Sequence, residues 1–443
     1  MKKMLLAALI VTAFSLQTAG AKTLEDVLKE KGVITDEDYK EVTKDVPQTK
    51  PLEYRLGEGF TFTSANEKFR MSLGSYSQVR YTYTDMDNDN NNLGAGKAQD
   101  VSQFALRRVK LFFNGYAYTP DLTYKLQINF ANLNGGTSTN GGILEETWMN
   151  YRIVDPAQFR FGQDKVQFGR QFIVSSAYDE FVDNSAATNA FVPGYDTGLQ
   201  FLGRVNNGLI TYSAGIFGGL GQDTFRTSND NAFNARIVFN PLGELKYVEA
   251  DINYSEKPLV AIGADFFSDT LKAATATTLE NNQLFFAKAG TGYFAVGSPL
   301  MPAGHQFAAN EKINFNTFSF DGTFEWRGLY VQSEYYIAQA DGQSSHNTLR
   351  AQGVYAQAGY FIVPKYVEIA GRYSYVDPNR DVSNDHWVEA QGAVSWYINK
   401  HNLKIQADYT NIHKQKLIAS TNPGPTANPT DDAQFRLQAQ ILF

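Results

Sequence analysis

The chain has 443 residues, no cysteine, 19% charged residues and a formal net charge of −7 at pH 7. The absence of cysteine excludes disulfide frameworks, cysteine zinc sites and thiol catalysis. The excess of acid makes the chain a poor partner for nucleic acid, which carries the same sign of charge. The length would suit two or three soluble domains, although single β-barrels are an exception to that rule.

The first 21 residues have the features of a cleaved export signal. Lys2 and Lys3 form a basic start, an apolar stretch runs over 5–16, and AGA at 19–21 is a small-residue cleavage site. A transmembrane anchor needs about 20 apolar residues, more than this stretch provides. Beyond residue 21 no long apolar run occurs. A membrane protein of this sequence would therefore have to cross as a barrel, in which every backbone polar group is paired.

Residues 22–50 differ from the rest of the chain because their apolar residues repeat with the period of a helix. TLEDVLKEKG places its apolar residues on one helical face. Thr35 followed by Asp38 resembles a capping box, which marks the start of a helix. We predict two short helices and a linker here, forming a periplasmic segment ahead of the rest of the chain.

From residue 57 onward, apolar and polar residues alternate with a period of two. In LTYKLQINF (122–130) and LKIQADYT (403–410) every second residue is apolar. Such alternation indicates strands with one apolar and one polar face. The segment KYVEADINY (246–254) is interpreted as part of a connection, because a further strand would place the later short turns at the wrong end. The predicted strands cover 69–84, 102–118, 121–133, 143–154, 157–163, 195–204, 208–218, 231–240, 258–268, 311–324, 327–340, 349–362, 365–377, 385–398, 402–412 and 433–443.

The connections alternate between short turns, such as TPD (119–121) and NN (206–207), and long polar loops, such as 85–100 and 420–432. This asymmetry is typical of outer-membrane barrels. A large soluble sandwich would also alternate, but it would not require short turns on one side only. No fixed-length repeat supports a solenoid. We therefore predict an all-β fold, a transmembrane antiparallel β-barrel of about 16 strands over 57–443, crossing the Gram-negative outer membrane many times.

In such a barrel the polar face of each strand lines the lumen. The predicted pore-lining cations are Arg70, Arg80, Arg108, Lys110, Lys125, Arg152, Arg160 and Arg204. Alternation also directs inward the cations Arg236, Arg372, Lys404 and Arg436 and the acids Glu146, Glu334, Glu368, Glu389 and Asp408. The surplus of cations could concentrate anions by focusing the electric field. Alternatively, these charges could pair across strands and merely keep the lumen wet.

The segment 164–194 is a long insertion, and loops of this length are uncommon unless they are functional. It contains apolar residues that are unusual for a loop in water. We predict that it folds into the lumen and narrows the pore; a loop over the mouth or on a neighbouring subunit is the alternative. The charged residues predicted at this constriction are Lys165, Arg170, Asp179, Glu180 and Asp183.

Several motifs resemble the phosphate-selective porin O and P family. LRRVKLFFNG (106–115) carries R-R-x-x-L-x-F-x-G, and FRFGQDKVQFG (159–169) carries F-G-x5-F-G. The resemblance implies trimeric sixteen-stranded porins of Gram-negative outer membranes, with a third loop in the lumen and inward arginines on the wall. The phosphate-selective members carry lysines and an arginine in that loop. This chain has no cation between Arg170 and Arg204, so phosphate selectivity is not carried over.

Signatures of enzymes do not occur in the sequence. The five histidines are scattered without metal-ligand spacing, and neither a P-loop nor a nucleophile elbow is found. The acidic loop DMDNDNNN (85–92) could bind calcium weakly, but it lacks the ordered spacing of a calcium loop. We therefore predict no catalytic residue, no metal and no cofactor.

The predicted function is an outer-membrane porin, a passive diffusion channel for small hydrophilic solutes with a modest preference for anions. Its predicted partners are outer-membrane lipid and lipopolysaccharide, small anions or hydrophilic solutes, and further copies of itself in a homotrimer. Two alternatives remain open. One is a surface adhesin or structural barrel with a plugged lumen, and the other is an outer-membrane hydrolase. Discrete open channels in a planar bilayer would distinguish the porin from both.

Overall fold

The computed structural model describes residues 28–43, 52–86, 100–131, 143–222, 224, 226, 228–275, 278–279, 307–308, 310–415 and 429–443. The predicted signal peptide, the linker before residue 51 and most of the acidic loop 85–92 lie outside the described residues. The chain divides into two units, 1–51 with 64–67 and 52–63 with 68–443. In the described part of the chain, no helix is long and apolar enough to cross a membrane.

The N-terminal unit contains helix α3 (Asp36–Thr43). The amide of Asp38 donates to Thr35 Oγ1 at 3.1 Å, and the amide of Thr35 donates to Asp38 Oδ2 at 2.9 Å. These reciprocal bonds satisfy amides at the start of the helix that have no partner within it. The hydrogen bonds from Thr35 also lower the pKa of Asp38. The capping box expected from the sequence is present.

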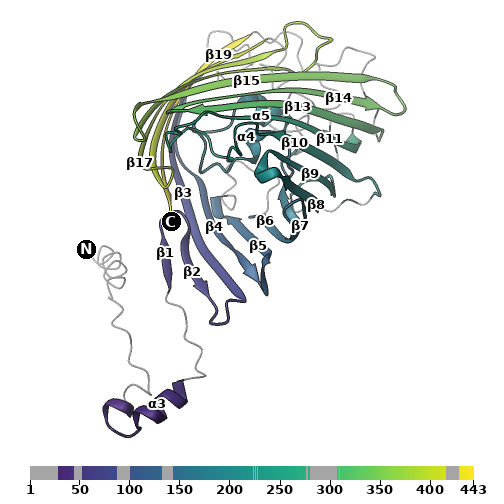
Figure 1. Cartoon of the computed structure of the whole chain (residues 1–443). Coiled ribbons are helices and arrows are strands. Elements are labelled where there is room, and N and C mark those ends of the chain that lie inside the picture. The colour runs from purple at the N-terminus through teal and green to yellow at the C-terminus, as the bar shows by residue number, and fades with distance from the viewer. Residues whose placement is uncertain are drawn as a thin grey trace, which may run out of the picture. The chain divides into compact units, whose positions relative to one another are not determined.

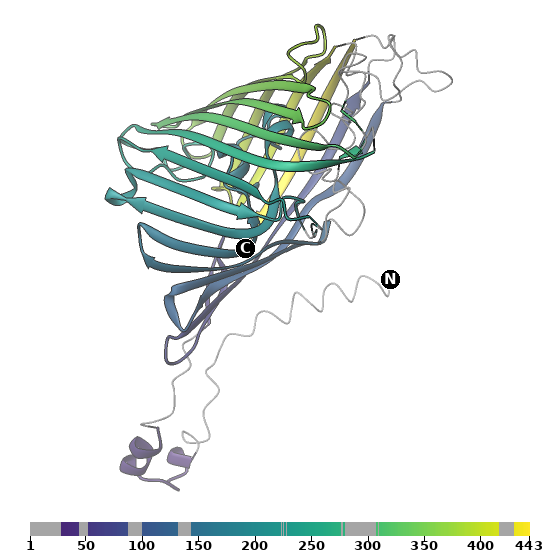
Figure 2. The same cartoon turned by 90° about the vertical axis from the view of Figure 1, so that its right-hand side faces the viewer.

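Sixteen antiparallel strands form a closed barrel (Figures 1 and 2). They are β3 (Phe69–Asp85), β4 (Val101–Ala117), β5 (Thr119–Asn129), β6 (Leu144–Val154), β7 (Ala157–Lys165), β8 (Tyr195–Val205), β9 (Ile210–Phe217), β10 (Ala232–Phe239), β11 (Leu259–Thr275), β13 (Lys312–Trp326), β14 (Leu329–Gly342), β15 (Thr348–Val363), β16 (Val367–Asp377), β17 (Trp387–Asn399), β18 (Leu403–Lys414) and β19 (Thr430–Leu442). Each predicted strand is confirmed, although β11 extends well past its predicted end. The segment 246–254 forms no strand, as predicted.

The barrel closes where β19 pairs with β3, from Ala433 opposite Asp85 to Leu442 opposite Tyr76. The short strand β2 (Gly59–Thr63) pairs with the remainder of β3. Since β4 occupies the other edge of β3, β2 and β19 follow one another along a single edge. The strand β1 (Glu53–Arg55) forms a hairpin with β2, and β12 (Thr278–Leu279) is a short partner of β11.

The outer surface of the barrel is apolar and the inner surface is polar, as β19 shows. Phe435, Leu437 and Ile441 are exposed on the outside, whereas Gln438 and Gln440 are buried. Polar side chains are therefore enclosed and apolar ones face outward, the reverse of a soluble protein and the arrangement that a lipid solvent requires. This confirms the sides predicted for the strand.

Loop 166–194, between β7 and β8, lies inside the ring of strands and contains helices α4 (Arg170–Ile173) and α5 (Ala186–Phe191) (Figure 1). Its aromatic residues join inward side chains of the far wall in a buried apolar cluster. Phe191 stacks on Tyr336 of β14, with ring centroids 5.4 Å apart and planes 7° apart. This side of the lumen is thus a packed core.

The connection between β10 and β11 also turns into the lumen. The amide of Glu249 donates to the Tyr178 carbonyl at 3.1 Å, and Glu249 accepts hydrogen bonds from Gln171 at 3.0 Å and from the amide of Glu180 at 2.7 Å. This connection supports loop 166–194 from the end of the barrel that carries the short turns.

Candidate pore constriction

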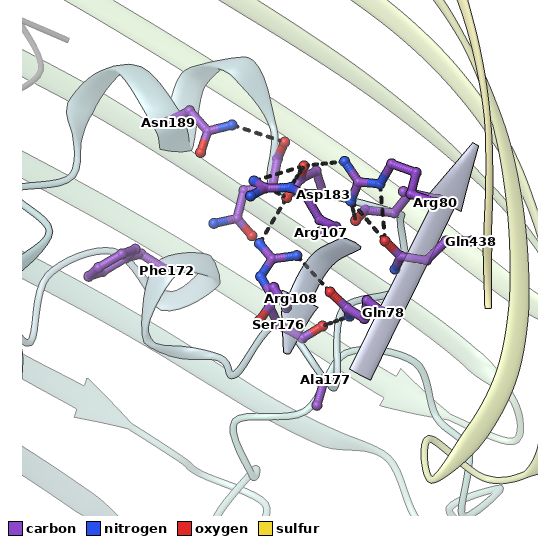
Figure 3. Close-up of polar contacts among 12 residues, drawn as sticks. Gln78, Arg80, Arg107, Arg108, Phe172, Ser176, Ala177, Asp183, Asn189 and Gln438 are labelled. Carbon is purple, nitrogen blue, oxygen red and sulfur yellow. Dashed lines mark hydrogen bonds and ion pairs between the residues drawn. The ribbon is translucent and has the colours of Figure 1, made fainter. Parts of the chain in front are cut away.

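Asp183 of loop 166–194 lies among three arginines of the barrel wall (Figure 3). Its carboxylate accepts hydrogen bonds from Arg80 at 2.9 Å, Arg108 at 3.1 Å and Arg107 at 3.3 Å. Burial by itself would raise the pKa of Asp183. The three guanidinium groups outweigh that effect and hold the pKa well below its ordinary value. One carboxylate is therefore shared by three cations, which leaves positive charge around it.

Arg107 was not among the predicted pore residues, and a β-bulge explains its place. Gln78 of β3 is opposite Arg108, but the next residue, Val79, is opposite Leu106. Arg107 is thus an extra residue in β4, and such bulges redirect a side chain. The tandem Arg107-Arg108 could have signalled the bulge, because strict alternation would put one arginine in lipid at a cost of roughly 2–4 kcal/mol at the midplane.

A second bulge brings two adjacent acids into the lumen. Gln127 of β5 is opposite Glu146, but Ile128 is opposite Leu144, so Glu145 is the extra residue. Both glutamates are buried. Glu145 pairs with Lys110 at 2.5 Å, and Glu146 pairs with Lys125 at 2.7 Å.

Wall cations also hold the loop through its backbone carbonyls. Lys404 donates to the Asp179 carbonyl, Arg80 to that of Val182 and Arg372 to that of Asp183, each at 2.8 Å. The Asp179 carboxylate is buried, and neither of its oxygens has a hydrogen-bond partner among the described residues. Burial, reinforced by the Glu249 carboxylate, raises the pKa of Asp179 to about 7.

Glu180 faces a different wall, formed by β15 and β16. Its Oε2 accepts a hydrogen bond from Gln357 at 2.8 Å. Its Oε1 lies 1.8 Å from the point that a Cβ on Gly359 would occupy, and Glu368 Oε1 lies 2.9 Å from the same point. Burial and then the neighbouring Glu368 raise the pKa of Glu180 well above its ordinary value. This environment favours the protonated form of Glu180. Tyr397 donates a hydrogen bond to the neighbouring Glu368 at 2.6 Å.

A cavity of about 260 Å³ separates the loop from the wall of β4 to β8. It is lined by Lys110, Lys125, Arg160 and Lys165, by Glu146, Asp164, Gln127, Gln167 and Trp148, and by Ile173, Ser175, Ser176 and Tyr195. Arg160 pairs with Asp164 at 2.5 Å and its guanidinium lies 4.1 Å from the Trp148 ring centroid. Four of the predicted cations thus meet at this cavity, which we call the passage.

Three of the other predicted residues, Arg152, Arg204 and Arg170, do not line the passage. Arg152 and Arg204 lie near the short turns, with 47% and 41% of their side chains exposed, and pair with Asp121 and Glu244. Arg170 donates to the Lys246 carbonyl at 2.6 Å. Lys165, expected in the loop, is the last residue of β7. Its amine donates to the loop carbonyls of Phe172 and Val174 at 2.5 and 2.8 Å.

The number of inward acids predicted from the sequence is too low, because acids of β11 and β13 also face the lumen. Arg236 pairs with Asp265 at 2.6 Å and with Asp321 at 2.7 Å. Arg226 pairs with Asp269 at 2.9 Å. Arg236 and Arg226 are therefore neutralised by acids of β11 and β13. Within the described ranges, no group of three or more His, Asp or Glu residues is arranged to hold a metal ion.

Comparisons with known proteins agree with this architecture. The family model for phosphate-selective porins O and P matches residues 73–298 and 306–441. Solved structures with the same fold include OmpT of Vibrio cholerae (11% identity, TM-score 0.52, covering 84% of this chain and 98% of that one). The outer membrane channel DcaP of Acinetobacter baumannii is similar at 12% identity (TM-score 0.52, 86% and 99%). An anion-selective porin from Comamonas acidovorans is similar at 8% identity (TM-score 0.55, 84% and 99%). No curated protein sequence matches the chain significantly.

Proposed function

The chain belongs to the phosphate-selective porin O and P family of the Gram-negative outer membrane, and from that premise we propose how it works as a channel. It passes small hydrophilic solutes by passive diffusion and prefers anions modestly. The observation that carries this preference is the cluster around Asp183, where Arg80, Arg107 and Arg108 share a single carboxylate. In a narrow lumen with low-dielectric walls, this local surplus raises the concentration of anions.

The preference is modest because most lumen cations are paired. Lys110, Lys125 and Arg160 each contact a carboxylate in or beside the passage. No cation occurs in the loop after Arg170 and before its end at residue 194. A dehydrated phosphate would find few donors that are not already used, so we do not propose tight phosphate binding.

Loop 166–194 sets the size limit in this proposal, since it fills the lumen from the far wall and leaves the passage beside β4 to β8. The protein acts as a channel and not as an enzyme. It assembles as a homotrimer, which the trimer form of Vibrio cholerae OmpT supports by analogy of fold. Residues 1–21 are removed on export, and 22–50 form a periplasmic segment before the barrel at 57–443.

Recording from planar bilayers tests the proposal. Purified protein should give discrete open channels. In a potassium chloride gradient, the reversal potential should have the sign expected when chloride is more permeant than potassium. Arg107→Gln should lower the anion-to-cation permeability ratio by about twofold, because one of three clustered charges is lost. The matched control is Arg327→Gln, at an exposed turn residue whose guanidinium lies 5.2 Å from the Trp326 ring centroid. Electrically silent membranes, or cation selectivity, would overturn the proposal.

A further inference from the structure

A second, larger cavity adjoins the passage on the side of the short turns. Its volume is about 690 Å³, and it shares Lys125, Gln127, Trp148 and Ser175 with the passage. We call it the vestibule. Its aromatic lining residues are Tyr76, Phe112, Tyr116, Tyr124, Trp148 and Tyr178. The two cavities are therefore neighbours along the wall of β5 and β6.

The strand register explains why rings face water here. Tyr76 on β3 is opposite Lys110, and Arg70 is opposite Tyr116, so all four side chains share the lumen face. Phe112 lies across Gly74, where an added Cβ would be only 2.3 Å from its Cζ atom. The glycine thus lets the ring lie flat against the wall. Inward aromatic residues are unusual on a lumen face, which is ordinarily polar.

The cations of the vestibule are engaged to different degrees. Lys125 pairs with Glu146, although 26% of its side chain remains exposed. Arg70 lines the vestibule and makes no ion pair with any residue that the structure describes. Glu58, the acidic residue of the lining, is 3.7 Å from Arg55 instead. Among the described residues, the Arg70 guanidinium therefore has no acidic partner in a cavity that is also lined by aromatic rings.

We propose that the vestibule binds aromatic carboxylates, with Arg70 holding the carboxylate and the rings of Tyr116 and Trp148 contacting the aromatic group. A guanidinium fits a carboxylate with two parallel hydrogen bonds, and aromatic pairs attract beyond the area they bury. The volume lies within the roughly 300–1,000 Å³ that is usual for small-molecule sites. A small inorganic anion would contact only the guanidinium of Arg70, and a neutral aromatic compound would contact only the aromatic rings.

This inference rests on the proposed channel function and names the class of solute that the channel handles best. Benzoate added on the side of the short turns should reduce single-channel chloride current at a concentration about tenfold lower than acetate does, because its ring is buried in the vestibule. Benzyl alcohol and inorganic phosphate complete the probe set. If benzyl alcohol or acetate reduces the current at the same concentration as benzoate does, the inference is wrong, while the channel proposal stands.

Two variants test the named contacts. Arg70→Gln should raise the half-blocking concentration of benzoate about fivefold and leave that of acetate less changed, because acetate binds weakly in either case. Trp148→Leu should raise the benzoate value about threefold. Arg327→Gln is the matched control for Arg70→Gln and should change neither. An unchanged benzoate value in Arg70→Gln channels that conduct normally would overturn the assignment.

A measurement without current keeps the test independent of channel activity. Quenching of tryptophan fluorescence by benzoate in detergent reports on Trp148, one of four tryptophans in the chain. The benzoate-dependent part of the signal should disappear in Trp148→Leu and weaken in Arg70→Gln. If the membranes are silent but quenching persists, the channel proposal fails and the binding site stands. Equal quenching in wild type and in Trp148→Leu would count against the site.

Discussion

Asp183 and Glu180 are carboxyl residues of one short segment of the same loop, and the two walls they face shift their pKa values in opposite directions. Asp183 contacts the arginines of β3 and β4, which lower its pKa. Glu180 faces Gln357 and Glu368 of β15 and β16, where burial and a second acid raise its pKa. The tendency of these two acids to ionise therefore depends on the strands that they face.

The difference implies that the loop is docked in two ways. On the arginine side docking requires a deprotonated acid, and its strength comes from charge-assisted hydrogen bonds. On the acid side docking favours a protonated Glu180, because burial and the neighbouring Glu368 raise its pKa. Changes that remove a charge should therefore have large effects at Asp183 and small effects at Glu180.

The largest effect is expected for Asp183→Asn. The variant leaves three guanidinium groups around a neutral amide, and breaking a buried ion pair in this way costs about 3 kcal/mol. We expect a lower midpoint of thermal unfolding in detergent and a higher anion-to-cation permeability ratio, measured from the reversal potential. Asp155→Asn, which removes a half-exposed partner of Arg152, is the control. Equal unfolding midpoints for the two variants would contradict the claim that the ion pairs of Asp183 with the arginines stabilise the docked loop.

Gly359→Val should disrupt the acid side by sterics alone. A Cβ at this position would lie 1.8 Å from Glu180 Oε1, so the carboxyl group must leave its site. Overpacking of this kind costs about 1–3 kcal/mol. Single-channel recordings should show more frequent current fluctuations as the loop loosens. Gly392→Val is a control within β17, because a Cβ there would meet nothing within 4 Å; similar noise in both variants would argue against the Glu180 contact.

The stability of loop docking should fall both when the pH is raised toward neutral and when it is lowered into the acid range. The docked pKa of Asp179 is raised to about 7 from 3.8, so its contribution is complete below about pH 4 and is lost as the pH rises toward 7. The docked pKa of Asp183 is lowered, so its contribution is present at neutral pH and is lost in acid, below its ordinary value. Current noise should therefore be lowest near pH 4–5.

A single substitution separates the two effects of pH. Asp179→Asn should abolish the severalfold rise in current noise between about pH 4 and 7, and it should leave the rise in current noise at acid pH unchanged. Noise that increases steadily in one direction across the whole range would contradict the two-sided docking.

The smallest effect is expected for Glu180→Gln. A glutamine has the shape of the protonated acid and can donate to Glu368, so the unfolding midpoint should change by the equivalent of about 1 kcal/mol or less. The same chemical change at Asp183 is the informative comparison. A loss at Glu180 as large as that of Asp183→Asn would show that Glu180 is ionised in its site.

The sequence was sufficient to predict the positions of the strands, but it was not sufficient to predict all the side chains that line the lumen. Alternation predicted each barrel strand, because lipid and water impose opposite faces. It could not place Arg107 or Glu145, since a bulge shifts the pattern by one residue without changing composition. It also missed acids of β11 and β13, where inward residues such as Phe267 and Phe315 pack on the loop. Both faces of those strands are partly apolar, so the pattern carries less information there.

The constriction itself depended on contacts between distant segments. A long apolar insertion was enough to predict a loop in the lumen. The sequence could not predict which wall each acid of the loop would face. Asp183 and Glu180 are separated by only two residues, and their partners lie on β3, β4, β15 and β16. The turn of the β10–β11 connection into the lumen was likewise not foreseen, since its residues have no periodic pattern.

The seam between β3 and β19 joins residues separated by about 350 positions, as in the hydrogen bond from Gln434 to Thr84. Closing so long a stretch of chain is entropically demanding and belongs late in folding. Loop 166–194 bridges this seam, since Gln78 of β3 donates to the Ser176 carbonyl and Gln440 of β19 to that of Ala177. The element that narrows the pore thus also fastens the last pair of strands, so selection for permeability and selection for assembly act on the same residues.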